Sequence, residues 1–104
     1  MYIHAFMFRW AEGVTEEQKA RVKTEILALQ GRIPGLLETH VGENVSPRGQ
    51  GYGFCGVMKF ADEAALEAYY PHPVHAELTE WLMPLIQTVE MDFDAASSAR
   101  AYGA

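Results

Sequence analysis

A chain of 104 residues and 11.6 kDa has room for one compact domain, which excludes multi-domain and repeat architectures. Apolar residues make up 49% of the sequence and charged residues 21%, a composition typical of a globular protein with a single core. Eight Lys and Arg against fourteen Asp and Glu give a net charge of -6, which argues against nucleic acid as a partner.

The first half of the chain predicts a strand, a helix and a second strand. Two sets of mostly apolar side chains alternate from Tyr2 to Trp10, which is the period of a strand. Thr15 stands at an N-cap position and Gln18 completes a capping box, and the apolar residues that follow at helical spacing predict a helix over about 15–30. A second, weakly patterned strand is expected over 36–45, after a Pro-Gly turn.

The next segments predict a hairpin and two helices. Breaker residues over 44–52 indicate a loop, and the apolar segment 52–60 predicts a third strand that pairs with the second. A short helix is expected over 62–70, capped by the aspartate at its start. A further helix follows the Pro-His-Pro break and extends to about residue 86, bent or loosened near its end by Pro84.

The end of the chain completes the predicted fold. Apolar and acidic residues alternate over 89–94 and predict a fourth strand. The order strand, helix, strand, strand, helix, strand is that of a ferredoxin-like α+β fold with a four-stranded antiparallel sheet. We assign this domain to residues 1–94, and we expect 95–104 to be a tail that is either mobile or strapped onto a partner chain.

Both faces of the predicted strands are apolar, whereas the helices can cover only one of them. The uncovered face would be larger than the apolar patches that soluble monomers normally expose. We therefore predict a homodimer that packs sheet on sheet; the alternative is a monomer whose C-terminal tail folds over that face. The side chains opposite the helix-facing set are Ile3, Ala5, Met7, Cys55, Val57, Val89, Met91 and Phe93.

Cysteine usage and the apolar runs bear on location. Cys55 is the only cysteine, so an internal disulfide is excluded, and we interpret it as a small core residue. The sequence opens without a basic segment followed by a long apolar run, and its apolar runs are far shorter than the roughly 18 to 20 residues that span a bilayer. We expect a cytoplasmic protein with no membrane partner.

Histidines are the candidate acid–base groups, because an imidazole titrates near neutral pH. His4 is the polar member of an aromatic set on the first strand, so it points into an apolar cavity or is a core histidine bonded to a carbonyl. His75 falls on the first turn of a predicted helix, where the dipole favours the neutral imidazole, a usable base. His72 and His75 have the spacing of half a metal site, but no further ligand has a diagnostic spacing, so no metal is predicted.

Carboxylates and phenols near these histidines have two interpretations each. Glu90, Asp92 and Asp94 share one side of the fourth strand, and any that turns inward needs a hydrogen-bonded partner. A pair between Asp92 and an imidazole would fix the tautomer of the ring, whereas the alternative is a solvated edge strand. Tyr69 or Tyr70 can hold a substrate carbonyl or fill the core with its ring.

Motifs for common cofactors are missing from the sequence. It has no phosphate loop, no dinucleotide fingerprint and no serine elbow, and we expect no cofactor. Gly53 and Gly56 in the third predicted strand either mark a bulge or clear space for a cavity between the sheet and the helices. Such a cavity would take a small-molecule ligand.

A set of short motifs spread over the chain resembles one family. The motifs are the run 69–75 (Tyr-Tyr-Pro-His-Pro-Val-His), His4 in the opening strand, the turn 33–35, the segment 41–44 and the closing 91–93. Together they resemble the stress-responsive dimeric α+β barrel (Dabb) family, over nearly the whole chain to about residue 94. The resemblance implies a homodimer whose two sheets face each other as a barrel.

The resemblance also implies an activity and a site. Plant polyketide cyclases of this family close a linear polyketide thioester by intramolecular aldol condensation without a cofactor. Their catalytic imidazole corresponds to His75, its tyrosine partner to Tyr69, the first-strand histidine to His4, and the aspartate that orients the catalytic imidazole to Asp92. The sequence departs from them at His40, where they have Tyr, and at Glu90, where they have an apolar residue. The cavity lining implied is Phe6, Phe8, Gly56, Met58, Phe60, His72, Trp81 and Glu90.

Three functions remain open from the sequence. The leading hypothesis is a small cofactor-free enzyme that performs aldol-type cyclisation or isomerisation of a keto-containing molecule. In it His75, held by Asp92, removes a proton from the carbon next to a carbonyl group. Tyr69 or His4 stabilises the enolate that forms. The second is a non-catalytic, ligand-binding or stress-protection dimer. The third is a haem- or metal-assisted oxygenase with His72 or His75 as the ligand.

Overall fold

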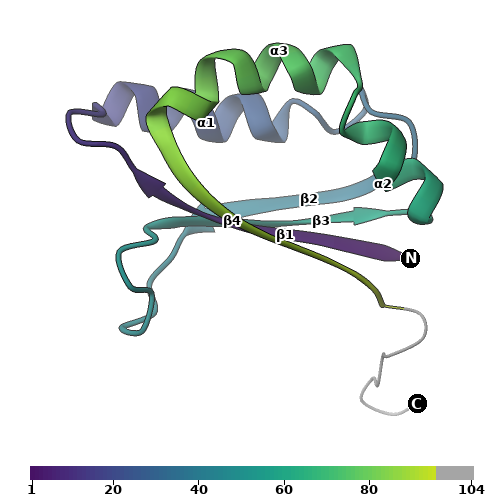
Figure 1. Cartoon of the computed structure of the whole chain (residues 1–104), viewed down its shortest axis with the longest axis horizontal. Helices are drawn as coiled ribbons and strands as arrows, with labels where there is room; N and C mark the ends of the chain where they lie inside the picture. Colours follow the sequence, from purple (N-terminus) through teal and green to yellow (C-terminus); the bar gives the residue numbers. More distant parts are fainter. Residues whose placement is uncertain (96–104) are drawn as a thin grey trace.

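The ferredoxin-like α+β architecture predicted from the sequence is confirmed. A computed structural model describes residues 1–95 (Figure 1), so the expected tail lies outside the described residues apart from its first member, Ala95. The elements are β1 (Tyr2–Trp10), α1 (Glu16–Leu27), β2 (Leu36–Glu43), β3 (Phe54–Phe60), α2 (Glu63–Tyr69), α3 (Pro73–Leu82), a 3₁₀ turn η1 (Met83–Leu85) and β4 (Ile86–Asp94).

The four strands form one antiparallel sheet in the order β2-β3-β1-β4, with the helices on one face (Figure 1). The two central strands, β1 and β3, carry much of the core. In the register between β1 and β4, His4 lies opposite Asp92 and Phe6 lies opposite Glu90. Opposed residues in an antiparallel pair point to the same face, so this register brings a histidine and two acids to the helix side of the sheet.

Side-chain caps start each helix. The Thr15 hydroxyl accepts a hydrogen bond from the Gln18 amide, and the Gln18 side chain accepts one from the Thr15 amide, which is the predicted capping box. The Asp62 carboxylate caps α2. At α3 the cap is His72, whose Nδ1 accepts a hydrogen bond of 3.1 Å from the Val74 amide.

The end of α3 and the start of β4 differ from the prediction. The helix ends at Leu82 rather than about residue 86, and β4 begins at Ile86 rather than 89. Pro84 lacks the amide hydrogen that an α-helical turn would use, and the chain tightens into η1 there. Ile86 is buried and enters the core from β4, although its apolar neighbours continue the helical pattern in the sequence.

Apolar side chains fill the space between the sheet and the helices. Val22 and Ile26 of α1 and Leu78 of α3 pack against aromatic residues of the sheet, with Phe60 fully buried. On the opposite face, Val89, Met91 and Phe93 of β4 are exposed. Within residues 1–95, no helix is long and apolar enough to cross a membrane.

Candidate active site

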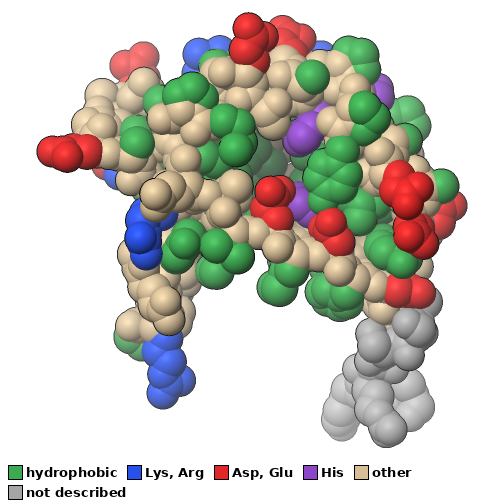
Figure 2. Space-filling model, viewed as in Figure 1, with side chains coloured by type: hydrophobic (Ala, Val, Ile, Leu, Met, Phe, Trp, Pro, Cys, Tyr) green, Lys and Arg blue, Asp and Glu red, His purple; other side chains and the backbone are tan. Residues whose placement is uncertain are grey.

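A cavity of about 300 Å³ lies between the sheet and the helix layer, and polar groups cluster at one part of its wall. Figure 2 shows a hollow between α3 and β4 in which histidine side chains are visible beside acidic ones. The cavity takes its walls from β1, β3, β4 and all three α-helices. Its lining is His4, Phe6, Phe8, Ile26, Met58, Tyr69, Tyr70, His75, Leu78, Thr79, Leu82, Met83, Ile86, Thr88 and Glu90.

Four of the residues expected to line the cavity are on its wall. Phe6 and Phe8 of β1 stack on each other with ring centroids 4.9 Å apart, and Met58 of β3 lies beside them. Glu90 of β4 contributes a carboxylate. The family resemblance implied all four residues, and the alternation of β1 by itself places Phe6 and Phe8 on one face of the strand.

The other four expected lining residues do not line this cavity, which corrects the prediction. Gly56 is covered by the ring of Phe6, which lies where a Cβ would stand. Phe60 is fully buried, and its ring packs against that of Tyr69 with the ring centroids 5.2 Å apart. His72 is engaged as the cap of α3, and Trp81 turns to α1, where the Arg21 guanidinium lies 4.1 Å from its ring centre.

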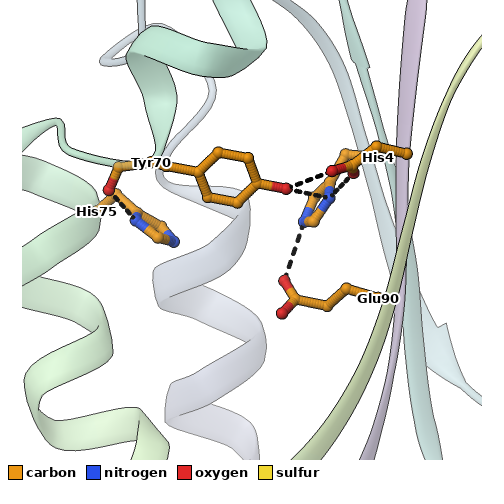
Figure 3. Close-up of polar contacts among 5 residues, drawn as sticks. His4, Tyr70, His75 and Glu90 are labelled. Atoms are coloured by element: carbon orange, nitrogen blue, oxygen red, sulfur yellow. Dashed lines mark hydrogen bonds and ion pairs between the residues drawn. The ribbon is translucent and has the colours of Figure 1, made fainter.

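A hydrogen-bonded triad joins the sheet to the end of α2. His4 is only 3% exposed, and its Nδ1 lies 2.6 Å from Oδ1 of Asp92. The hydroxyl of Tyr70 donates to Oδ2 of the same carboxylate at 2.6 Å and lies 3.3 Å from the His4 ring nitrogen. Figure 3 shows Tyr70 reaching across to His4 in this way. Because a carboxylate only accepts, Nδ1 of His4 carries the proton of this pair.

His75 is held by the backbone and not by Asp92, which corrects the predicted pairing. Its Nδ1 lies 2.9 Å from the carbonyl oxygen of Tyr70 (Figure 3). A carbonyl can only accept a hydrogen bond, so Nδ1 is protonated and Nε2 carries the lone pair when the ring is neutral. Asp92 is directed to His4 instead because the β1–β4 register sets those two residues opposite each other, whereas His75 stands on the first turn of α3.

Tyr69 and Tyr70 follow each other in the chain but have different surroundings. Tyr69 is buried, and its ring packs on His75 with centroids 4.2 Å apart. Burial, and then the charge of Glu90, raises the pKa of the Tyr69 phenol well above its usual value. The pKa of Tyr70 is raised too, first by desolvation and then by its hydrogen bond to Asp92 and the carboxylate charges of Asp92 and Glu90. Both phenols therefore keep their protons at neutral pH.

Glu90 and Thr88 are the remaining polar groups on the β4 wall. Oε1 of Glu90 lies 3.5 Å from Nε2 of His4, on the side of the ring opposite Asp92. The Thr88 hydroxyl is buried and has no hydrogen-bond partner among the described residues. The lining of the cavity, as described, includes no Lys or Arg.

Several contributors to the site were missed or left undecided by the sequence analysis. Tyr70 was one of two equivalent phenols, and Thr79 and Thr88 carried no signal. Alignment of the first and fourth strands could have paired His4 with Asp92, but the sequence does not give that register. Within residues 1–95, no three metal-ligating side chains gather into a group, and Cys55 lies on the other side of the sheet, away from this cavity.

Comparison with solved structures places the fold among small ferredoxin-like proteins. At3g17210 from Arabidopsis thaliana superposes with a TM-score of 0.84 at 22% identity, covering 90% of this chain and 94% of that one. A dimeric ferredoxin-like protein of unknown function from Thermobifida fusca gives 0.77 at 28% identity, covering 88% of each chain. A hydroxynitrile lyase from Passiflora edulis gives 0.82 at 18% identity, covering 88% of this chain and 90% of the lyase.

Comparison with protein families gives a more specific result than comparison with single proteins. No curated protein matches the sequence. The family described as Stress responsive A/B Barrel Domain matches residues 3–95, which include every element of the fold except the first residue of β1, Tyr2, and every side chain that lines the cavity. This chain therefore belongs to the stress-responsive A/B barrel domain family.

Proposed function

We propose that the protein is a cofactor-free enzyme that removes a proton from carbon next to the carbonyl group of a small molecule. The observation that carries this proposal is the hydrogen bond from His75 Nδ1 to the Tyr70 carbonyl, since it leaves Nε2 of a cavity-lining imidazole as a free base. The products we favour are those of aldol-type cyclisation or isomerisation.

The base acts in a setting that supports proton transfer. Nε2 of His75 takes the proton, and the electrons of the carbon–hydrogen bond form an enolate whose negative charge collects on the carbonyl oxygen. The imidazolium that results retains its hydrogen bond to the Tyr70 carbonyl, which stabilises the positive charge. The enolate carbon then attacks a second carbonyl of the substrate, whose carbon–oxygen π electrons move to the oxygen, and that oxygen takes the proton back from Nε2 of His75. In an isomerisation the proton instead returns at another carbon.

Tyr69 is the donor that we assign to the enolate oxygen. Its ring packs against His75, so a carbonyl within reach of its hydroxyl presents the neighbouring carbon to the base. Its raised pKa keeps the phenol protonated, which is the form that donates a hydrogen bond. His4 is a second polar group that could stabilise the enolate, and it lies at the same end of the cavity. Asp92 holds the His4 ring in place and acts as its positioning residue.

The apolar walls and the fold family add support. Phenylalanine, leucine and isoleucine side chains line much of the cavity, and a wall of low polarity strengthens hydrogen bonds to a developing charge. One structural neighbour is a hydroxynitrile lyase, so lyase chemistry occurs on this fold. Fold likeness alone does not transfer a reaction, and the proposal therefore depends on His75.

Hydrogen–deuterium exchange tests the base directly. Aryl ketones and 1,3-diketones in D₂O should lose protons next to the carbonyl faster with the protein than without it, as followed by proton NMR. In His75→Asn the amide can still donate to the Tyr70 carbonyl but supplies no base, so the exchange rate should fall by about 10² to 10⁴-fold. Tyr69→Phe should lower it by about a hundredfold.

His72→Asn is the matched control for this experiment. It makes the same substitution three residues earlier, and asparagine is itself a good N-cap, so α3 should start normally. Exchange should stay at the wild-type rate because His72 does not line the cavity. Equal rates in His75→Asn and wild type, or no exchange above the solvent background with any ketone, would remove the base from the proposal. Ligand binding without exchange would favour a non-catalytic binding protein.

We also propose that two copies of the chain pack through their open sheet faces. The face away from the helices carries exposed apolar side chains and a depression of about 370 Å³ lined by residues of all four strands. Figure 2 shows hydrophobic side chains gathered on this side of the sheet. The similar structure from Thermobifida fusca is dimeric, which supports a dimer here, and the apolar sheet face is the surface that most needs a partner.

A further inference from the structure

Two polar side chains on the cavity wall have no task in the proposed reaction. Glu90 and Thr88 are two residues apart on β4, in register with Phe6 and Phe8 of β1, and all four line the cavity. Side chains at positions i and i+2 of a strand share a face and stand about 7 Å apart along it. Together Glu90 and Thr88 form a polar strip along one wall, a term used below for this pair.

Glu90 keeps hydrogen-bonding capacity for a ligand. Its distance of 3.5 Å from Nε2 of His4 is longer than a good charge-assisted hydrogen bond, and its side chain is 46% exposed. Its charge contributes to the raised pKa of both Tyr69 and Tyr70, so its field extends across the cavity. No Lys or Arg of the described chain lines the cavity to balance this charge.

Thr88 presents an unused hydroxyl. Its Oγ1 is buried and makes no hydrogen bond within residues 1–95, which is unfavourable unless a ligand or solvent molecule supplies the partner. Thr79, the other threonine on the wall, differs because its hydroxyl donates to the Ala76 carbonyl at 3.1 Å. An unpaired hydroxyl on a residue that lines the cavity can bind an oxygen of a ligand as donor or as acceptor.

Apart from His75 and Thr79, the walls formed by α1 and α3 are apolar. Ile26, Leu78 and Leu82 contribute only hydrocarbon there. A ligand that fits both sides needs one edge with hydrogen-bonding groups for the polar strip and another edge without them. A carboxylate on the polar edge would meet the charge of Glu90 where no Lys or Arg lines the wall and His4, the nearest ring, is already bonded to Asp92, which disfavours free acids.

We infer that the polar strip selects uncharged carbonyl compounds that carry hydroxyl groups, and that it excludes carboxylates. Glu90 accepts a hydrogen bond from a ligand hydroxyl, and Thr88 pairs with a second oxygen further along β4. Both are specificity-determining residues in this inference, which rests on the proposed function for the carbonyl group of the ligand. A cavity without the polar strip would instead accept any apolar ketone of suitable size.

Binding of three matched ketones tests the inference without turnover. The probes are 2,4-dihydroxyacetophenone, 4-methylacetophenone and 4-acetylbenzoate, with dissociation constants measured by isothermal titration calorimetry. Wild type should bind the dihydroxy ketone at least about tenfold more tightly than the carboxylate. Glu90→Gln should reduce that ratio by about tenfold. Thr88→Val, which keeps the shape and removes the hydroxyl, should weaken the dihydroxy ketone about three- to tenfold and leave the methyl ketone unchanged.

Two controls remove equivalent groups elsewhere. Glu80→Gln deletes one negative charge on the exposed side of α3, and Thr24→Val deletes a hydroxyl on α1, so neither should change the ratios. The inference is overturned if wild type binds the carboxylate as tightly as the dihydroxy ketone, if Glu90→Gln leaves the ratio unchanged, or if none of the ketones binds. The predicted preference without any proton exchange would instead refute the proposed function and leave the polar strip standing.

Discussion

At the scale of single residues, Asp92 organises the polar end of the cavity. One carboxylate oxygen is paired with His4 and the other with Tyr70, each at 2.6 Å. Hydrogen bonds to an ionised acceptor are shorter and stronger than neutral ones, so this one side chain ties β1 and the end of α2 to β4. Both carboxylate oxygens have a partner, which supports the positioning role proposed for Asp92, and His75 is bonded to the backbone carbonyl of Tyr70 instead.

Tyr70 gives the first prediction at this scale, which concerns alkaline pH. Its phenol has a pKa raised above the ordinary value of 10.0, so the folded state holds a proton that the unfolded chain loses first. The contribution of Tyr70 to the free energy of unfolding should therefore be constant below about pH 10 and fall as the pH rises beyond it, in addition to the fall due to Tyr69. In Tyr70→Phe the fall should be shallower, and stability at neutral pH should drop by about 1 kcal/mol through loss of the hydrogen bond.

Urea unfolding at neutral pH and at several values above pH 10 measures both effects. Asp92→Asn should also flatten the alkaline fall, because the hydrogen bond and charge of Asp92 are among the causes of the raised pKa. The assignment to Tyr70 would be wrong if Tyr70→Phe lost stability above pH 10 as steeply as wild type.

The candidate site was predictable from the sequence in its members more than in its contacts. His4, which interrupts an aromatic set, was expected to face an apolar cavity or to be a core histidine, and the family resemblance implied the catalytic imidazole at His75; both line the cavity. The partner of Asp92 was not predictable, because a shift of two residues between β1 and β4 would preserve every alternation while changing each opposed pair. Tyr70, and not Tyr69, donates a hydrogen bond to Asp92 because of the backbone direction at the end of α2. The spacing of apolar and polar residues in the sequence does not describe that direction.

At the scale of elements, the sequence predicts the bounds of a helix or strand where one local pattern dominates. It does not predict them where the same residues fit both a helix and a strand. Strand β1 has the predicted bounds, and the capping box starts α1 where expected. Strand β4 begins three residues before the predicted start because the apolar residues near Ile86 fit the helical period as well as a strand. Tertiary packing settled that ambiguity, since Ile86 is buried in the core from the strand.

Gly56 gives the prediction at this scale. The residue pairs regularly with Phe6 and Val41, and no bulge occurs there, so of the two explanations for a glycine the clearing of space applies. A Cβ at this position would overlap the ring of Phe6 and lie 2.8 Å from Cγ1 of Val41. Gly56→Ala should therefore lower the free energy of unfolding by about 1 to 3 kcal/mol and move the ring that forms the cavity wall.

Gly53→Ala is the control for that substitution, because the nearest side-chain atoms to its Cβ are those of Trp10 at 4.0 Å, an ordinary contact. Its stability should change by less than about 0.5 kcal/mol. Thermal unfolding of both variants measures the difference. Equal effects of the two substitutions would mean that the space above Gly56 is not needed by the Phe6 ring.

At the scale of the whole molecule, the sheet separates two apolar environments. The helix side contains the core and the cavity, whereas the other side carries Val89, Met91 and Phe93 in exposed positions. A sheet face of this kind is stable in water only when something covers it, and a twofold pair of identical faces covers both at once. In that assembly β4 contributes to both environments, with Glu90 on the cavity wall and its apolar residues toward the second copy.

Met91 tests the assembly most directly because it is 63% exposed at the centre of the β4 row. In Met91→Glu, twofold symmetry would bury two carboxylates in an apolar interface, which is strongly unfavourable without a cation. Light scattering at micromolar concentration should give twice 11.6 kDa for wild type and a mass near 11.6 kDa for the variant. Leu27→Glu, a matched change at an exposed position on α1 in the helix layer, should remain dimeric. A wild-type mass near 11.6 kDa would refute the sheet-to-sheet dimer, and a dimeric Met91→Glu protein would move the interface to another surface.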